Sequence, residues 1–222
     1  MSPIFRPILA GAQFRDRLTG CIGAGIGIAL TMVVCAGLPP LGADLPIIVA
    51  PLGASAVLVF AVPSSPLAQP WPVVGGNIIS TLIGVAMFQL VPDVTAAAGL
   101  AVGGAILVMS LLRCLHPPGG AAALTAVIGS QGIHAAGYGF AFMPVGINSI
   151  ALVSLAMFYH RATARSYPHQ PAAAPATVAA AGFRPEDIDA ALADMHESFD
   201  ISRDDLDALL ARAELHAQAR RR

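Results

Sequence analysis

Arg113 and His116 stand three residues apart in the stretch RCLHPPGGAAAL, residues 113–124, within a chain that is otherwise almost continuous hydrocarbon. Arg113 is a permanent cation, so it either attracts an anion or anchors the chain at a membrane interface. His116 either donates to a bound anion or bonds a carbonyl group freed by a broken helix. Pro117 and Pro118 stop one helix and preset the first turn of the next. The stretch therefore predicts a helix break with a cation and an imidazole beside it.

The composition around this break is that of an integral membrane protein. Of the 222 residues, 56% are hydrophobic and 11% are charged, whereas soluble domains carry about a quarter charged residues. Residues 18–159 hold three formal charges, on Asp44, Asp93 and Arg113, and ten of the 13 acidic residues follow position 183. The sequence thus predicts an apolar bundle with a polar C-terminal tail.

Several kinds of chemistry lack the residues they need. All twelve basic residues are Arg, which excludes the Lys of a phosphate-binding loop and a Schiff-base Lys. The sequence has no nucleophile–base pair, no metal-ligand spacing and no pair of intramembrane aspartates. Cys21, Cys35 and Cys114 lie in or beside apolar segments, which is typical of reduced packing residues. We expect no enzyme, catalytic residue, metal, cofactor or nucleic-acid partner.

Six apolar windows can be recognised, at residues 18–38, 47–62, 73–91, 94–112, 119–130 and 140–159. A helix needs about 17–25 residues to cross a bilayer, so four windows are long enough and the second and fifth are short. Two models remain open: four spans with two re-entrant elements, or six crossings. Arg residues before the first window and after the last place both termini in the cytoplasm in either model. We expect a multi-pass protein of the bacterial inner membrane.

The two halves of the bundle resemble one another. The segment PLGASAVLVF from Pro51 aligns with PGGAAALTAV from Pro118, and Asn77 aligns with Asn148 in a second pair of segments. Short Pro/Gly-interrupted helices in corresponding halves are typical of transporters. With three crossings in each half, the repeats 18–91 and 94–160 are inverted relative to one another. Chance similarity in a chain rich in Ala and Gly is the alternative.

Inverted repeats direct the N-termini of both broken helices toward the middle of the membrane, where unpaired N–H groups and the helix dipole favour an anion. Asn77 and Asn148 either bond the solute or join helices. No Asp or Glu lies inside an apolar window, so His116 or the solute has to carry any coupled proton. The predicted substrate-binding residues are Arg113, His116, Gly119, Gly120, Ala121, Gly53, Ala54, Ser55, Asn77 and Asn148, with Pro51, Pro117 and Pro118 shaping the backbone.

The predicted domains are a cytoplasmic N-terminus at 1–17, the bundle at 18–160, a Pro/Ala linker at 161–182 and an acidic helical tail at 183–222. Pro185 suits a first helical turn, and Ser202 with Asp205 resembles a capping box. The tail therefore predicts a soluble helical hairpin. Glycine pairs four residues apart, Gly23 with Gly27 and Gly99 with Gly103, predict close helix packing. We also expect a homo-oligomer in contact with membrane lipid.

The run HPPGGAAAL and the upstream stretch APLGASAVLVFAVPSSPLAQPWPVVGGN resemble the HPP family of integral membrane proteins, named for the His-Pro-Pro. The resemblance covers roughly residues 15–159. It implies a bundle of four membrane spans. Because some plant and cyanobacterial members transport nitrite, the resemblance also implies an anion such as nitrite.

The fold predicted from these patterns is an all-α membrane bundle of about six helical elements, two of them short, followed by the tail. The predicted function is a transporter or channel for a small inorganic anion, with nitrite first among the candidates. The alternative is a non-transporting membrane scaffold or sensor whose C-terminal tail binds a partner.

Overall fold

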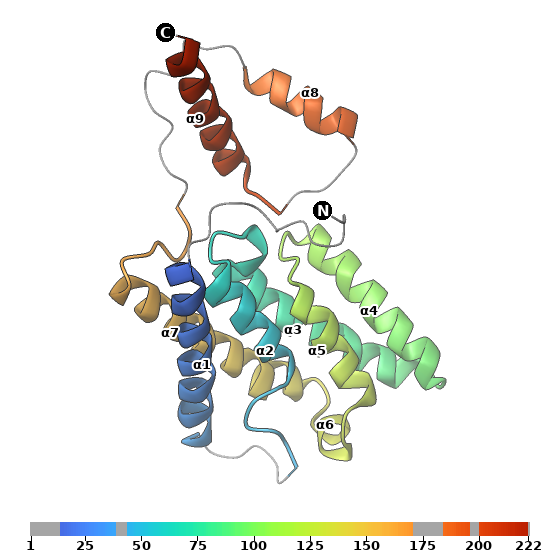
Figure 1. Ribbon diagram of the computed structural model, residues 1–222. Helices are drawn as coiled ribbons and strands as arrows, with labels where there is room; N and C mark the ends of the chain where they lie inside the picture. Colours follow the sequence, from blue (N-terminus) through green and yellow to red (C-terminus); the bar gives the residue numbers. More distant parts are fainter. Residues whose placement is uncertain (1–13, 39–43, 171–183, 196–199, 222) are drawn as a thin grey trace, which may run out of the picture.

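The computed structural model describes residues 14–38, 44–170, 184–195 and 200–221, and within these ranges every regular element is a helix (Figure 1). The long helices of the bundle are α1 (Phe14–Ala36), α3 (Pro70–Leu90), α4 (Val94–Leu111) and α7 (Ile147–Ala162). The shorter elements are α2 (Pro51–Ala56), η2 (Val57–Ala61), η3 (Pro66–Ala68), α5 (Pro117–Ile128), α6 (Gln131–Ala136) and η4 (Ala141–Gly146). The tail forms α8 (Pro185–Met195) and α9 (Arg203–Arg221).

Four apolar helices are long enough to cross a membrane: α1, α3, α4 and the continuous segment Ala141–Ala162 formed by η4 and α7. The apolar helices Pro51–Ala61 and Pro117–Ile128 are shorter. This confirms the predicted set of four long and two short elements. Many large apolar side chains, such as Val33, Leu107 and Phe158, point outward, as expected where the surrounding solvent is lipid.

An irregular segment, residues 44–50, leads into the short helix α2. Residues 44–50 run from the end of the bundle at which α1 finishes up to the start of α2, and α2 with η2 continues to the opposite end (Figure 1). Asn148 on α7 holds this segment, because its Oδ1 accepts from Val49 N at 3.0 Å and its Nδ2 donates to Ile47 O at 2.9 Å. Irregular backbone at membrane depth needs such partners within the protein.

The six apolar helices of the bundle, with α2 and η2 taken together and η4 and α7 taken together, alternate in direction along the chain (Figure 1). As a result α1, α2 and α3 run opposite to α4, α5 and α7, respectively. Pro51 and Pro118, which pair in the sequence repeat, both lie in the first turn of a short helix. The two halves therefore have the opposed orientation that an inverted repeat requires.

The break between α4 and α5 is made by Arg113. This residue adopts a left-handed φ of 54°, while Cys114 N donates to Met109 O and Arg113 N donates to Ser110 O. These two bonds form a Schellman motif, which ends a helix by satisfying its last carbonyl groups. Pro117 then opens α5, so the chain reverses direction within a few residues.

Glycine allows α3 and α5 to approach closely at this break. A Cβ atom on Gly76 would lie 2.7 Å from His116 Cβ and 2.8 Å from Cys114 O, and one on Gly119 would lie 2.6 Å from Ser80 Oγ. In α1, Cβ atoms on Gly23 and Gly27 would collide with Phe60, which confirms the packing role predicted for that pair.

The other predicted glycine pair packs differently. Gly99 and Gly103 on α4 are exposed, and a Cβ atom on either would meet no described atom within 4 Å. The buried face of α4 is instead made of Ala97, Ala101, Ala105 and Met109. The expectation that Gly99 and Gly103 tighten the bundle within one chain is therefore wrong, since the face that carries them points outward.

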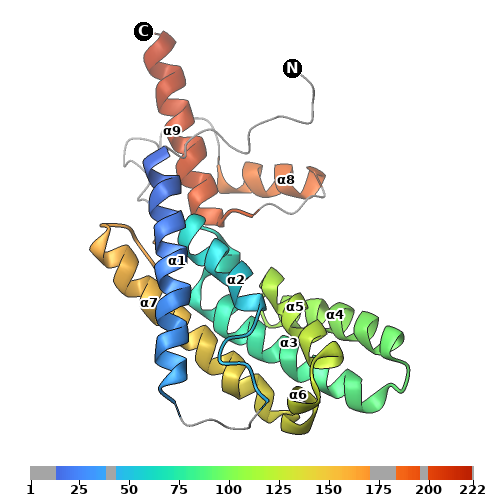
Figure 2. The same ribbon diagram turned by 60° about the horizontal axis from the view of Figure 1, so that its bottom comes forward.

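The tail lies beyond the end of the bundle at which α1 begins (Figures 1 and 2). Asp205 N donates to Ser202 Oγ at 3.1 Å, so the predicted cap of the second tail helix is confirmed. Arg203 pairs with Asp189 of α8, and the two helices diverge at an open angle (Figures 1 and 2). Parts of the predicted N-terminus and linker, residues 1–13 and 171–183, lie outside the described residues.

Candidate functional site

A buried polar cluster lies where the two short helices meet α3 and α7. It consists of Ser55 on α2, Asn77 on α3, His116 at the N-cap of α5 and Ser149 on α7. All four side chains are 1% exposed or less. Asn77 is the eighth residue of α3, which places it about 10 Å along that helix. The cluster is therefore a polar centre inside a largely apolar bundle.

Short hydrogen bonds connect the four side chains. Ser55 Oγ lies 2.8 Å from His116 Nε2. Asn77 Nδ2 lies 3.1 Å from Ser149 Oγ and 3.4 Å from Ser55 Oγ. At the edge of the cluster His116 Nδ1 lies 2.9 Å from Leu67 O, and Ser149 Oγ donates to Val145 O at 2.9 Å.

The partners determine where the hydrogen atoms lie. A carbonyl oxygen only accepts, so His116 Nδ1 carries a hydrogen and donates it to Leu67 O. In the neutral ring Nε2 is then an acceptor, and the Ser55 hydroxyl donates to it. Asn77 donates both of its N–H groups, to Ser55 and Ser149. Every donor of the cluster is thus used in one directed chain that ends on protein acceptors.

One acceptor is left over. Asn77 Oδ1 is buried and has no hydrogen-bond partner among the described residues. A buried polar atom without a partner costs about 1–3 kcal/mol, so such an atom calls for an explanation, of which a functional role is one. This atom lies on the residue that links α2 to α7 through the two serines, so the unpaired group is at the centre of the cluster.

The structure brings together three of the residues singled out from the sequence, namely Ser55, Asn77 and His116. It places Asn148 apart from them, with its amide bound to the irregular segment before α2. Arg113 is exposed at the end of α4, outside the buried cluster and at the end of the bundle that the tail occupies (Figure 1).

Two of the backbone N–H groups expected to face a solute have partners within their own turns. Gly53 N donates to Ala50 O at 3.0 Å, and Gly119 N donates to His116 O at 2.8 Å. Gly53, Ala54 and Ala121 are exposed on the outer side of their helices, and Gly120 is half-buried. The end of α2 does lie beside the start of α5, because Ser55, the fifth residue of α2, reaches the N-cap of α5. Their contribution to the cluster comes from side chains.

Two groups of the site were not predicted from the sequence: Ser149, and the Leu67 carbonyl at the edge of the cluster. Ser149 directly follows Asn148 in the stretch INSI, and it is Asn148 that pairs with Asn77 in the repeat. A hydroxyl next to a buried amide in an apolar helix was the available signal. A backbone carbonyl, by contrast, has no sequence signature.

The donor set does not resemble a metal centre. Among the described residues no group of three or more His, Cys, Asp or Glu side chains comes together. The cluster instead offers one imidazole, one amide and two hydroxyls, which bind polar solutes through hydrogen bonds.

Four membrane-length apolar helices, two short helices and a buried polar centre define a polytopic α-helical membrane protein. The model of a protein family described as "HPP, transmembrane region" matches residues 10–168. The chain therefore belongs to the HPP family of membrane proteins, and the sequence resemblance is confirmed.

Two proteins of Dictyostelium discoideum, each described as a transmembrane protein, are similar to this chain. One is 35% identical over 133 residues, which are 58% of this chain and 46% of that protein. The other is 38% identical over 120 residues, which are 52% of this chain and 38% of that protein. The matched region thus spans less than half the length of either relative. No solved structure matches the chain.

Proposed function

We propose that this protein is a transporter or channel for a small monovalent anion, with nitrite as the first candidate, and that the solute passes through the buried cluster. The observation that carries the proposal is the set of four polar side chains, fully buried at the junction of both short helices with α3 and α7. Polar groups inside a membrane bundle are costly, and they commonly mark a solute pathway.

The hydrogen-bond directions suggest how the cluster changes its affinity for an anion. With His116 neutral, Nε2 accepts the hydrogen bond that the Ser55 hydroxyl donates. A proton added to Nε2 turns the ring into a cation with a second N–H donor. Ser55 Oγ can then accept from this N–H, and the Ser55 hydroxyl hydrogen can turn to Pro51 O, which lies 3.4 Å away, or to a solute. Imidazolium, hydroxyl and the Asn77 amide would together offer the positive, donor-rich surroundings that an anion requires.

This scheme links anion passage to a proton. Between positions 18 and 159 the carboxylates are Asp44, which precedes α2, and Asp93, the N-cap of α4. His116 is the titratable group of the cluster, and the solute itself is the other proton carrier available. Flux that accelerates on acidification follows from either case.

Nitrite is chosen on the family resemblance. The cluster geometry supports a small hydrogen-bond acceptor, and the choice among nitrite, nitrate, formate and chloride belongs to experiment. Arg113, exposed at the cytoplasmic mouth, would raise the local anion concentration there. We place the protein in the bacterial inner membrane with both termini in the cytoplasm, as a non-enzymatic homo-oligomer surrounded by lipid. The outward-facing Gly99 and Gly103 supply a small-residue face for helix association.

The test is flux in liposomes that contain the purified protein. Nitrite entry is measured at two pH values with nitrate, formate and chloride as competitors. Selective entry that rises on acidification is the expected result. The variant His116→Asn keeps a donor near the position of Nδ1 but removes Nε2, so it should slow entry and abolish the acceleration by acid. Ser110→Ala, an exposed hydroxyl that bonds within α4, is the matched control.

Absence of flux for every anion, from protein shown to be folded, would contradict the proposal. It would favour the alternative of a membrane scaffold or sensor whose C-terminal tail binds a partner.

A further inference from the structure

The turn before α3, residues 63–69, is closed by its own side chains. Ser65 caps η3, because Leu67 N donates to its Oγ at 3.1 Å. Gln69 Nε2 donates to Pro63 O at 2.9 Å and to Ser65 O at 2.8 Å. The turn is thus a small rigid unit at the end of the bundle that faces the tail (Figure 1).

The C-terminal part of the chain binds this turn at several points. Tyr167 Oη donates to Ala68 O at 2.8 Å, and burial raises the pKa of this phenol, so it remains a donor. His169 N donates to Gln69 Oε1 at 2.9 Å. Ser65 Oγ donates to Asp200 Oδ1 at 2.8 Å, just before α9 begins.

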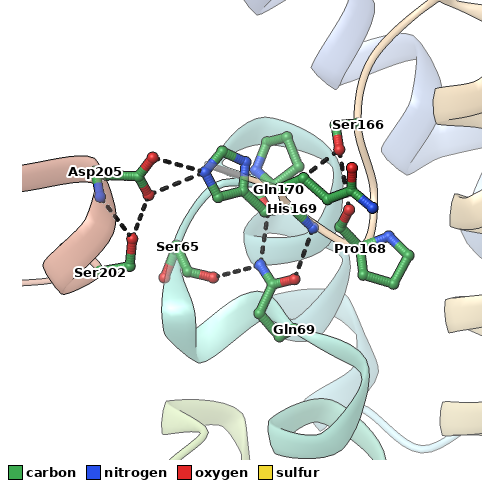
Figure 3. A network of polar contacts seen from close by, with 9 residues as sticks. Ser65, Gln69, Ser166, Pro168, His169, Gln170, Ser202 and Asp205 are labelled. Carbon is green, nitrogen blue, oxygen red and sulfur yellow. Dashed lines mark hydrogen bonds and ion pairs between the residues drawn. The ribbon is translucent and has the colours of Figure 1, made fainter. Parts of the chain in front are cut away.

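The ring of His169 fixes the second tail helix. His169 Nε2 lies 2.9 and 3.0 Å from the two carboxylate oxygens of Asp205, which is itself bound to the Ser202 cap (Figure 3). Arg165 pairs with Asp16 of α1 at 2.6 Å. The described chain after α7 is therefore bound to the bundle over residues 165–169, and the start of the second tail helix is bound to the same region.

The opposite side of the same turn holds the polar cluster. The carbonyl of Leu67 accepts from His116 Nδ1 at 2.9 Å, and the next carbonyl along the chain, that of Ala68, accepts from Tyr167. Two consecutive peptide groups thus contact the cluster on one side and the C-terminal segment on the other. A movement of the turn changes both sets of bonds.

We propose that the tail is a clamp: its docking through Asp200 and Asp205 holds the 63–69 turn in place, and the turn, through the Leu67 carbonyl, holds His116 in the sealed cluster. The docked arrangement is the closed one, since all four cluster side chains are buried. Release of the tail frees the Leu67 carbonyl to move, and His116 loses the bond that fixes its tautomer and orientation. On the function proposed above, release of the tail then raises anion flux.

The charges around this contact are compatible with a clamp that depends on the two aspartates. Asp200 faces Ser65, and Asp205 faces Ser202 and the ring of His169. The neighbouring Arg203 is bound to Asp189 and Asp207 within the tail. The tail thus reaches the 63–69 turn through Asp200 and the linker after α7 through Asp205.

The test compares two double variants of the full chain. Asp200→Ala with Asp205→Ala removes the docking carboxylates. Asp194→Ala with Asp204→Ala removes the same charge from exposed positions of the same tail and is the control. Tail release is measured by hydrogen exchange over residues 200–221. The state of His116 is measured by NMR of ¹⁵N-labelled histidine, with its ring signals assigned by their loss in His116→Gln.

In the docking variant we expect a released tail, shifted His116 ring signals and a rise in anion flux of roughly tenfold, as when a tenfold preference for the sealed state is removed. The control variant should match the wild type in all three measurements. Unchanged His116 signals in a variant whose tail is released would overturn the clamp.

The two proposals fail in different ways. Shifted His116 signals with no anion flux in any protein, wild type included, would support the clamp and contradict transport. If the tail is released in the docking variant and both double variants still show the flux of the wild type, the clamp is overturned and transport stands.

Discussion

The substitution Asn77→Asp tests whether the buried cluster binds an anion, because it changes charge with almost no change in shape. Asn77 is 1% exposed, and its Nδ2 lies 3.1 Å from Ser149 Oγ and 3.4 Å from Ser55 Oγ. In the variant a carboxylate replaces the donor group, and both hydroxyls can turn to donate to it. The cluster keeps its size and exchanges a donor surface for a negative one.

The expected loss follows from Coulomb's law. A solute hydrogen-bonded to either serine would lie about 4 Å from the new charge, and two like unit charges at that separation repel by about 4 kcal/mol at an effective dielectric constant of about 20. This corresponds to about a thousandfold weaker binding. Protonation of His116 beside the carboxylate would offset part of the repulsion, so we expect nitrite flux to fall by at least about tenfold.

The assay is the initial rate of nitrite entry into liposomes, normalised to the amount of folded protein. Gln89→Glu makes the same amide-to-acid change on the same helix at an exposed position, and it should retain wild-type flux. Wild-type flux in folded Asn77→Asp would refute the placement of the anion in this cluster.

Three further predictions follow from the break between α4 and α5 and from the tail. Gly76→Ala should lower stability by about 1–3 kcal/mol, since overpacked sites cost this much and the added Cβ would lie 2.7 Å from His116 Cβ; denaturant unfolding in detergent measures it, and wild-type stability would contradict the close packing. Arg113→Gln should lower flux with a loss that shrinks as salt is raised, because its charge acts at the mouth through a screened field; a loss independent of salt would contradict that role. Burial opposes ionisation of Asp205, but hydrogen bonds from Ser202 and His169 and the charge on His169 hold its pKa below the usual 3.8. The docked tail therefore keeps this stabilisation above the usual carboxyl pKa and loses it as pH falls through the lowered value. Tail-to-bundle fluorescence transfer should report release at acid pH in the wild type and no pH-dependent change in that range for Asp205→Asn, which lacks the titrating group.

Much of the bundle was predictable because hydropathy and proline act locally. The six apolar windows correspond, in chain order, to α1, to the short helix made of α2 and η2, to α3, to α4, to α5 and to the segment made of η4 and α7. Pro51 and Pro117 open the two short helices, since proline suits a first helical turn and cannot continue a preceding helix. The Ser202 cap likewise depends on neighbours three residues apart.

The inward faces of these helices could not be predicted in the same way. A helix in lipid is apolar on all sides, so its periodicity does not show which side meets protein. Gly23 and Gly27 pack against Phe60, whereas the similarly spaced Gly99 and Gly103 face outward. Only the packing of the helices distinguishes the two pairs.

The same limit applies to the candidate site. The sequence by itself determined a membrane bundle with two broken helices and a short list of polar residues, because composition and proline are read residue by residue. The tertiary structure decided that Ser55 meets His116 across 61 residues and that Asn77 meets Ser149 across 72. It also decided that Asn148 supports a backbone segment and that the tail reaches the turn that holds His116. These contacts depend on the angles and depths at which the helices cross, and those are set by the packing of the whole bundle.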